Sequence, residues 1–532
     1  MAYTPSPQQQ TFYEWVEERW SDDVPKSKSC VLEAVAGAGK TTTLVNGVSK
    51  MKGFIFFGAF NRKIAEEIKA KTAGLGLDKL TVGTMHSEGF KIWRRLAKSV
   101  KVDGSKCRNI VRNRVEELRQ GGLDEDADKI SQFETQIVKL VSLAKQSGCG
   151  FVWTNRSTWF EMIDHYDIDC VDEEEFVVRA AIGVLKKSVS MDYEVVDFDD
   201  MIYCPLLHGA NPFKYDWVLI DEAQDTNATR RELALRILKP GGRLVAVGDR
   251  HQAIYGFTGA DANALDLIGE AVNAIRLPLT VTYRCPKKVV EHAHHWVTHI
   301  QAHETAPEGE VTTLEDGKKL SEVCKPGDAI LCRFNAPLMS LVYGFIAEGI
   351  PAKIEGREIG SGLKQLAKRW KVRSVDGLIG KLEVFLEKET AKLIAKDQEG
   401  KVQAIQDKVD CLMVIIERCR TKVTKGVSVV DVVCNEVDSI FSDDVSAKFV
   451  TLSSIHKSKG REWPNVFWMQ TGPSKMAKKS WEMEQEMNLN YVATTRAMER
   501  LILLNAPSDT KRKVEETDNV KVENGNEENH ED

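Results

Sequence analysis

Several features that define other protein classes are missing from this chain of 532 residues. No apolar run approaches 18 residues, so we expect no membrane-spanning helix. The eleven cysteines are scattered and no two form a C-x-x-C pair, which favours free thiols in a reducing compartment. The first ten residues, MAYTPSPQQQ, lack the charged and then apolar pattern of a secretion signal. These absences predict a soluble cytoplasmic protein without a membrane partner.

A large charge of one sign is also missing, because the formal net charge is −6. Residues Asp509 to Asp532 hold nine acidic and four basic side chains, a difference of −5. The rest of the chain is therefore nearly neutral, which is compatible with a basic groove for nucleic acid. The polar segment 509–532 is predicted to be a disordered acidic tail that binds a protein partner.

The length predicts three or four domains, at about 150 residues each. Short apolar runs bounded by Gly, Asp or Pro indicate buried parallel strands, and helical patterns lie between them. These runs begin at Cys30, Gly53, Trp217, Arg243, Ala329, Phe449, Asn465 and Leu501. Segments 91–187 and 366–445 carry few strand signals, so we interpret them as helical insertions into α/β domains.

A candidate phosphate-binding loop, AVAGAGKTT, follows the first of these runs. Glycine lets backbone N–H groups turn inward around an anion, and the following helix adds partial positive charge. Lys40 is expected to reach the β- and γ-phosphates of ATP, and Thr41 to hold Mg²⁺. Ala34 stands where the usual pattern begins with Gly. The predicted phosphate-binding residues are Ala36, Gly37, Ala38, Gly39, Lys40, Thr41 and Thr42.

A second apolar run, within YDWVLIDEAQDT, ends at two adjacent carboxylates. Asp221 is the candidate Mg²⁺ ligand, and Glu222 is the candidate general base that polarises the attacking water. The alternative, a helix cap and its first turn, is outweighed by the presence of the phosphate loop. Together the two motifs predict an ATPase.

Further motifs follow in a fixed order: TPSPQQQ, AFNRKIAEEI, VGTMHSEGF, VDFDDMI, VAVGDRHQAIYGFTGAD, LTVTYRCP, VTLSSIHKSKGREWPNVF and LNYVATTRAMERL. With them the chain resembles the superfamily 1 DNA helicases of the UvrD/Rep/PcrA type, apart from the two insertions and the tail. The resemblance implies an α/β fold with two RecA-like parallel-sheet P-loop domains and two mainly helical insertions. It also implies an ATP- and Mg²⁺-dependent DNA helicase that moves 3′ to 5′ on single-stranded DNA.

The resemblance adds nucleotide contacts from outside the loop. Gln8 is expected to read the adenine edge and Tyr283 to stack on adenine, while Gln252 senses the γ-phosphate. Gly460 and Glu462 are expected near the ribose. Arg284 and Arg496 are expected to stabilise transition-state charge as arginine fingers, an effect worth about 10³–10⁵ in rate.

The implied DNA contacts are Phe60, Asn61, Thr84, His86, Tyr255, Phe257 and His456. Tyr255 and Phe257 follow Gln252 closely, so phosphate sensing and base stacking share one segment. Stacking contributes about 1–3 kcal/mol per base and tolerates any sequence. Core packing is the alternative for both aromatics. The signature VDFDDMI matches the family, but its residues suggest no chemistry by themselves.

The resemblance also predicts domain limits. The first RecA-like ATPase domain comprises 1–90 and 188–277, with a helical insertion at 91–187. The second comprises 278–365 and 446–508, with a small helical insertion at 366–445. ATP bound between the domains would close them, and hydrolysis would release them, which produces stepping along a strand. The substrates would be single-stranded and forked duplex DNA, in the nucleoid or, for a viral protein, the host cytoplasm.

Other functions stay open from the residues alone. A translocase that strips proteins from DNA and unwinds poorly would share every motif, as would a non-motor ATP-dependent loader or recombination mediator. An RNA helicase is a further alternative. Four histidines, His292, His295, His299 and His303, have helix-compatible spacing, and we favour a solvated helical face over a metal site there.

Overall fold

The computed structural model of the chain divides into two compact units. The first unit comprises Met1–Tyr283 and Lys479–Asn488, and the second comprises Arg284–Lys478 and Leu489–Asp532. The structure describes residues 4–18, 29–76, 78–97, 100–171, 173–190, 194–256, 259–261, 263–314, 319–334, 337–338, 341–342, 344–345, 348, 350–355, 357–394, 402–423, 427–440, 449–471 and 479–505. The predicted acidic tail at 509–532 lies outside these ranges.

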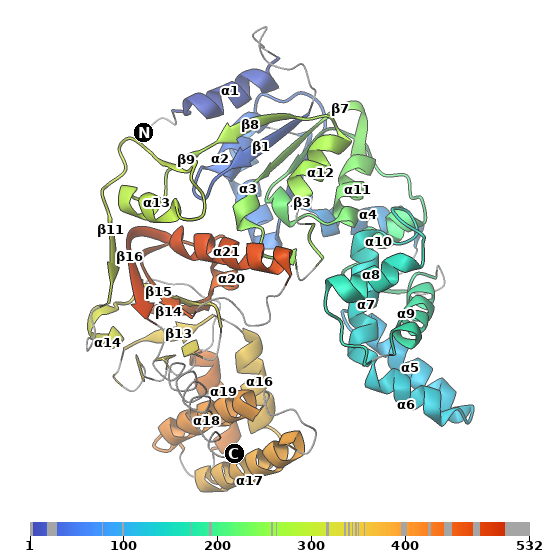
Figure 1. Cartoon of the computed structure of the whole chain (residues 1–532), viewed down its shortest axis with the longest axis vertical. Coiled ribbons are helices and arrows are strands. Elements are labelled where there is room, and N and C mark those ends of the chain that lie inside the picture. The colour runs from blue at the N-terminus through green and yellow to red at the C-terminus, as the bar shows by residue number, and fades with distance from the viewer. Residues whose placement is uncertain are drawn as a thin grey trace, which may run out of the picture. The chain divides into compact units, whose positions relative to one another are not determined.

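A six-stranded parallel sheet forms the centre of the first unit (Figure 1). In spatial order its strands are β3 (Leu80–Thr84), β2 (Ile55–Ala59), β6 (Tyr215–Ile220), β7 (Leu238–Gly248), β1 (Cys30–Ala34) and β8 (Ile275–Leu279). Most are short, apolar and buried, as expected of parallel strands covered on both faces. Because they all run in one direction, their carboxyl ends share one edge, where open α/β sheets bind ligands.

Helices that connect the strands cover this sheet. They are α1 (Pro7–Val16), α2 (Lys40–Val48), α3 (Arg62–Thr72), α4 (Met85–Leu96), α10 (Asp200–Leu207), α11 (Ala228–Ile237) and α12 (Ala264–Ala271), with 3₁₀ turns η1 (Ala73–Leu75), η2 (Ala223–Asp225) and η3 (Arg250–Gln252). Phe56, Val218 and Leu244 of the sheet pack with Leu233 and Ile268 of the helices in one core. Burial of each such side chain stabilises the fold by about 1.5–3 kcal/mol.

A bundle of helices inserted after α4 has a core of its own. Its helices are α5 (Lys106–Gln120), α6 (Asp124–Gln132), α7 (Glu134–Ser147), α8 (Ser157–His165) and α9 (Glu174–Ser188). A short parallel pair, β4 (Lys101–Val102) and β5 (Val195–Val196), joins the chain where it enters and leaves the bundle. This bundle overlaps segment 91–187, for which the sequence predicts a helical insertion, although that segment begins inside α4.

The second unit is built on another six-stranded parallel sheet. In spatial order its strands are β11 (Glu310–Thr313), β16 (Ala497–Asn505), β15 (Trp463–Gln470), β12 (Ala329–Cys332), β14 (Val450–Ser454) and β13 (Ala352–Ile354). Its helices are α13 (Lys287–Ala293), α14 (Leu320–Val323), α16 (Arg357–Ala367), α17 (Val375–Ile394), α18 (Val402–Cys419), α19 (Val429–Ile440), α20 (Ile455–Ser458) and α21 (Ser480–Thr494), which begins in the first unit. One core joins this sheet to the helices from α16 to α19.

The predicted fold class, two parallel α/β sheets with helical insertions, is confirmed. Two further short strands, β9 (Val281–Thr282) and β10 (Gln301–Ala302), lie outside the two large sheets. The helical face predicted for the histidines is wrong beyond Ala293, where α13 ends and turns follow. In the described parts of the chain, no helix combines the length and apolar character needed to cross a membrane.

Candidate active site

The phosphate loop joins the end of β1 to the start of α2, at the carboxyl edge of the first sheet. Gly37 and Gly39 have φ values of 72° and 75°, a region that residues with a Cβ atom rarely adopt. Ala36, which precedes Gly37, and Ala38, which lies between the two glycines, are buried. Gly39 is the N-cap of α2, so the first N–H groups of this helix have no partner within it. Such N–H groups and the partial positive charge of the helix terminus bind phosphate oxygens.

Lys40 and Thr41 begin α2 and contact the two carboxylates that follow β6. Nζ of Lys40 lies 2.9 Å from Oε1 of Glu222, and Oγ1 of Thr41 donates to Oδ2 of Asp221 at 2.8 Å. Burial alone would lower the pKa of Lys40, but the carboxylates of Glu222, Asp249 and Asp221 outweigh burial and raise it. The structure therefore brings together the four residues predicted to hold phosphate, metal and water.

Negative charge exceeds positive charge at this point, because three carboxylates surround one ammonium group. Burial and then the charge of Glu222 raise the pKa of Asp221 to about 6. Burial likewise raises the pKa of Asp249. Carboxylate and hydroxyl oxygens with excess negative charge are the ligands that Mg²⁺ prefers in proteins. Thr41 and Asp221 therefore fit the predicted magnesium ion.

Gln224 and Asp249 link these carboxylates to the end of β7, and sequence reasoning missed both residues. Nε2 of Gln224 donates to Oε2 of Glu222 at 2.5 Å, and its Oε1 accepts from the backbone N–H of Asp249 at 3.0 Å. The carboxylate of Asp249 accepts from Nε2 of Gln252 at 2.7 Å. Glu222 has a φ of 53°, which costs energy for a residue with a Cβ atom and is held by these contacts. Both residues follow a predicted strand closely, and this position is the sequence feature that could have identified them.

The amide of Gln8, the residue predicted to read the adenine edge, is paired with Thr280. Its Nε2 donates to Oγ1 of Thr280, and its Oε1 accepts from the backbone N–H of Thr280, both at 2.9 Å. The neighbouring Gln9 is buried, and its Nε2 donates to Oγ1 of Thr43 at 2.9 Å. Sequence reasoning chose Gln8 and missed Gln9, although the side chain of Gln9 lies against the loop.

Tyr283 also lies beside the loop, because its backbone N–H donates to the carbonyl oxygen of Gly37 at 2.9 Å. Its ring is 49% exposed, which leaves a face for stacking on adenine. Thr42 is exposed on the first turn of α2 and accepts at its carbonyl oxygen from Asn46. Both residues are therefore accessible on the side of the loop where the sequence predicts the nucleoside.

Two of the aromatic residues predicted to contact DNA stack on each other. The ring centroids of Phe60 and Tyr255 are 6.0 Å apart, and the ring planes differ by 16°. Phe60 is 37% exposed and follows the end of β2 directly. Accessible aromatic rings of this kind are the surfaces on which single-stranded bases stack. Phe257 lies outside the described residues.

Asn61 and Thr84 have a role in the fold itself, because each caps the helix that follows it. Oδ1 of Asn61 accepts from the backbone N–H of Ile64 at 2.9 Å. Oγ1 of Thr84 accepts from the backbone N–H of Ser87 at 3.1 Å. Polar caps of this type stabilise a helix by about 1 kcal/mol. Their side chains are thus already engaged at the two positions where the sequence predicts DNA.

His86 and His456, the histidines predicted to face DNA, are both uncharged at neutral pH. Burial and then the nearby Arg230 lower the pKa of His86 to about 4. Burial and then Arg333 and Lys459 lower the pKa of His456 to about 4. A neutral imidazole can donate one hydrogen bond but offers no charge to a phosphate. Either histidine would therefore contact DNA by hydrogen bonding or packing.

Arg284 and Glu462 pair with each other in the second unit. Nε of Arg284 lies 2.5 Å from Oε2 of Glu462, and its Nη1 donates to the carbonyl oxygen of Thr495 at 3.3 Å. The sequence predicts both side chains near ATP, one at the γ-phosphate and the other at the ribose. The structure brings the two together as an ion pair.

Arg496 is only 1% exposed within the second unit. Its guanidinium donates to the carbonyl oxygens of Val492 and Arg461 at 2.9 and 3.0 Å. Gly460, one residue before Arg461, has a φ of 80°, which explains glycine at this turn. Backbone carbonyls thus orient the guanidinium of Arg496 from two sides.

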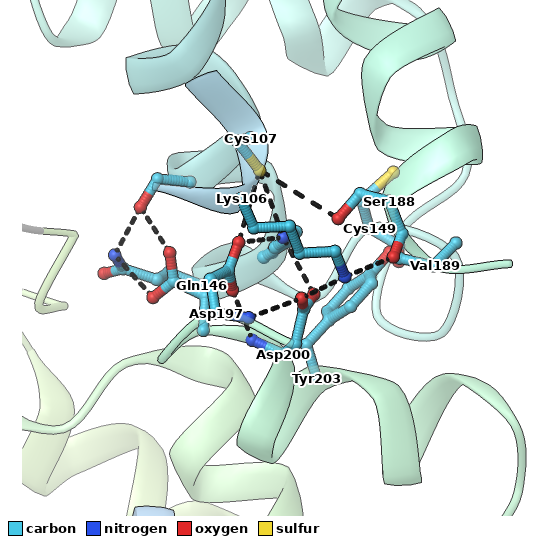
Figure 2. Close-up of polar contacts among 12 residues, drawn as sticks. Lys106, Cys107, Gln146, Cys149, Ser188, Val189, Asp197, Asp200 and Tyr203 are labelled. Atoms are coloured by element: carbon cyan, nitrogen blue, oxygen red, sulfur yellow. Dashed lines mark hydrogen bonds and ion pairs between the residues drawn. The ribbon is translucent and has the colours of Figure 1, made fainter. Parts of the chain in front are cut away.

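The VDFDDMI signature forms a buried ionic cluster beneath the helical insertion (Figure 2). Asp200 lies 2.5 Å from Nζ of Lys106 and 2.8 Å from Nζ of Lys145. Asp197 lies 2.7 Å from Lys145, and Lys106 also donates to the carbonyl oxygen of Ser188. Two lysines from α5 and α7 are thus balanced by two aspartates. The signature, which suggested no chemistry in the sequence, joins α5 and α7 of the insertion to the start of α10 within the first unit.

Two family models match this chain in comparisons with known proteins. Residues 15–272 match the model of the UvrD/REP helicase N-terminal domain, and residues 375–507 match that of the UvrD-like helicase C-terminal domain. The ATP-dependent DNA helicase Rep of Escherichia coli (strain K12) is 24% identical over 288 residues, which are 50% of this chain and 40% of Rep. The ATP-dependent DNA helicase PcrA of Bacillus subtilis (strain 168) is 25% identical over 293 residues, 50% of this chain and 36% of PcrA. The chain thus spans well under half the length of these curated relatives.

Proposed function

The chain belongs to the UvrD/Rep/PcrA-like helicases of superfamily 1, and we propose that it is an ATP-dependent motor that moves along single-stranded DNA and unwinds forked duplex. The observation that carries the proposal is the contact of Lys40 and Thr41 with Glu222 and Asp221. These residues form an ATPase site on the same sheet edge as Phe60, the exposed ring at the end of β2.

We propose that ATP binding breaks the ion pair between Lys40 and Glu222. The γ-phosphate would attract Lys40, and Glu222 would then be available to accept a proton from the attacking water. Thr41 and Asp221 would hold Mg²⁺, which would offset the charge of the phosphates when bound. The pairing seen between Lys40 and Glu222 thus keeps the general base occupied until nucleotide arrives.

The chain of contacts through Gln224 supports coupling between hydrolysis and DNA. Gln224 joins Glu222 to the backbone of Asp249, and Asp249 holds Gln252. Gln252 lies three residues before Tyr255, whose ring stacks on Phe60. A change in the hydrogen bonding of Glu222 would therefore reach the proposed base-stacking rings through three polar contacts and a short loop.

We also propose that Arg284 and Arg496 supply positive charge to the transition state. Arg284 would exchange the carboxylate of Glu462 for phosphate, a charge-for-charge replacement that costs little. Arg496 keeps a fixed orientation through its backbone acceptors. We further propose the domain limits that were predicted from the sequence. We also propose that the acidic tail binds a protein partner.

Movement from 3′ to 5′ and a role in replication, repair or recombination rest on the family resemblance. Duplexes with a single 3′ or 5′ tail test the polarity directly. We expect ATP-dependent unwinding from the 3′ tail only, and none with Lys40→Ala. Hydrolysis stimulated by DNA without unwinding, but with displacement of a protein block, would instead identify a protein-stripping translocase. ATP binding without DNA-stimulated turnover would identify a loader or mediator.

A further inference from the structure

A cavity of about 280 Å³ lies within the first unit, where the helical insertion meets the loop after η3 and the first half of α21. Four aromatic side chains contribute to its wall: His165 and Tyr166 at the end of α8, Tyr255 of the loop, and Trp481 of α21. Leu267 of α12 also lines the cavity and is 37% exposed, so the cavity opens to solvent on that side. None of the described residues that line it is predicted to hold ATP or Mg²⁺.

Two rings of the insertion hold the indole of Trp481 in place. The indole stacks on the imidazole of His165, with centroids 5.1 Å apart and ring planes that differ by 21°. The ring of Tyr166 meets the indole edge to face at 6.2 Å. Cavities that bind small organic groups begin at about 300 Å³ and combine apolar or aromatic walls with a few polar groups. The size and the aromatic wall of this cavity therefore suit one flat ring.

The charges around the cavity favour an uncharged occupant. Its lining contains two carboxylates, those of Asp261 and Glu484, and the described lining residues include no lysine or arginine. Asp261 is neutralised by its ion pair with Arg231, and Glu484 is exposed to solvent. Burial and then the charge of Lys479 lower the pKa of His165 below its ordinary value, so the imidazole is neutral at pH 7. A phosphate group would therefore meet negative charge without a positive partner, whereas an uncharged ring would not be repelled.

Three amide side chains, those of Asn263, Gln485 and Asn488, add polar groups to the wall. Nδ2 of Asn488 donates to the carbonyl oxygen of Ala253 at 3.0 Å, which fixes the first half of α21 against the loop. A Cβ atom at Gly256 would lie 2.1 Å from Nε2 of Gln485, so a side chain at position 256 would displace this amide. An amide both donates and accepts hydrogen bonds, as the edge of a nucleobase does. The wall thus fits an uncharged ring with a polar edge.

We propose that this cavity binds one nucleobase of the single-stranded DNA, packed against the indole of Trp481. This inference rests on the proposed function, because Tyr255 lines the cavity and also stacks on Phe60 in the proposed DNA path. A strand that meets Phe60 and Tyr255 can place a neighbouring base in the cavity while its phosphates stay in solvent. The helical insertion, which supplies His165 and Tyr166, would thereby help to hold the strand.

The test measures binding of single-stranded deoxythymidine oligonucleotides that are intact or lack the base at one position at a time. Trp481→Ala should weaken binding of the intact oligonucleotide about tenfold, as loss of stacking on one base does. Trp481→Phe keeps an aromatic ring and should recover most of that affinity. The control is Phe213→Ala, which should leave affinity unchanged. Phe213 is similarly exposed, at 39%, but precedes β6 and so lies at the opposite edge of the sheet from Phe60.

The positions at which a missing base weakens binding separate a base contact from a structural effect. In the wild-type protein, one such position should belong to the cavity, and the weakening there should disappear in Trp481→Ala. Leu267→Trp, which fills the cavity from an exposed position, should remove the same position, whereas Phe60→Ala should remove a different one.

An unchanged pattern of positions in both Trp481→Ala and Leu267→Trp would overturn the base site while leaving the motor intact. Loss of the same single position in Trp481→Ala and Phe60→Ala would also overturn it, because the cavity would then hold no base of its own. Failure of the wild-type protein to bind the intact oligonucleotide would instead overturn the proposed function.

Discussion

Two buried ionic clusters of the first unit contain the same residue types but differ in their balance of charge. In the ATPase cluster, Lys40 faces three carboxylates, those of Glu222, Asp249 and Asp221. In the insertion cluster, defined by Lys106, Lys145, Asp197 and Asp200, two lysines face two aspartates.

The difference in charge balance separates a binding site from a structural joint. The ATPase cluster keeps an excess of negative charge, and burial raises the pKa of Asp221 to about 6. In the insertion cluster, burial opposes ionisation of Asp197, but Lys145 outweighs it and lowers the pKa of that carboxyl. The first cluster is therefore completed by a ligand, whereas the second is complete within the fold.

The largest expected effect is on stability, in the insertion cluster. Lys145→Met should lower the free energy of unfolding of the first unit by about 3–5 kcal/mol, because it leaves buried carboxylates without their partner. Denaturant unfolding followed by Trp fluorescence measures this. The matched control is Lys187→Met, since Lys187 is an exposed lysine of α9 whose pair with Glu117 contributes little. Similar stability of the two variants would contradict a structural role for the cluster.

The second effect is on catalysis, in the ATPase cluster. Lys40→Ala should reduce ATP turnover by about 10²–10³-fold or more, as expected when a donor to transition-state charge is lost. Binding of single-stranded DNA should remain measurable, because the proposed DNA contacts are elsewhere. Steady-state phosphate release measures the loss of turnover, and oligonucleotide binding measures the DNA affinity that should remain. Normal turnover in the variant would remove Lys40 from the catalytic set.

The third prediction concerns acid, to which Asp221 of the first cluster and Asp197 of the second should respond with opposite sign. The folded pKa of Asp221 lies near 6, above its ordinary value of 3.8, so the folded state takes up this proton first. Its contribution to the free energy of unfolding therefore rises as pH falls from about 7 towards 4. Asp197, with a lowered pKa, contributes stability above pH 3.8 that is lost as pH falls below that value.

Replacement of each aspartate sharpens this contrast. Asp221→Asn should raise the stability of the nucleotide-free protein at pH 8 by roughly 1–3 kcal/mol, and by less at pH 5. Asp197→Asn should lower stability at both values of pH. Midpoints of denaturant unfolding at pH 5 and pH 8 provide the comparison. A loss of stability in Asp221→Asn at pH 8 would show that the ATPase cluster is also balanced internally.

The smallest effect separates a helix cap from a DNA contact. Thr84→Ala should lower stability by about 1 kcal/mol through loss of the cap on α4. Thr84→Ser keeps a hydroxyl acceptor and should recover most of it. The oligonucleotide affinity of Thr84→Ala is then measured with and without a stabilising osmolyte. An equal loss of affinity under both conditions would show that the hydroxyl contacts DNA as well as capping the helix.

The sequence predicts the ATPase cluster well, because its residues stand at strand ends in a known order. Parallel strands align Ala34 and Ile220 at one edge, which brings Lys40 close to Glu222 although 182 residues separate them. The eight short apolar runs likewise coincide with strands β1, β2, β6, β7, β12, β14, β15 and β16. Strands such as β3 and β8 were missed, since LTVGT and IRLPL carry weak apolar signals.

Features that depend on tertiary contacts could not be predicted from the pattern. Neither Lys106 nor Lys145 lies in a motif, and their pairing with VDFDD depends on how α5 and α7 pack against α10. The neutral state of His86 follows from burial and from Arg230, which is distant in sequence. Gln8 and Gln9 are adjacent on α1 but contact different residues, Thr280 and Thr43, because their side chains leave the helix in different directions.

The most direct test of the account is the rate of ATP hydrolysis by the wild-type protein and Glu222→Gln, each with and without a single-stranded deoxythymidine oligonucleotide. We expect a wild-type rate that rises severalfold with DNA, and near-complete loss of turnover in Glu222→Gln under both conditions, with ATP binding retained. Hydrolysis by Glu222→Gln at the wild-type rate, or a wild-type rate that does not respond to DNA, would contradict it.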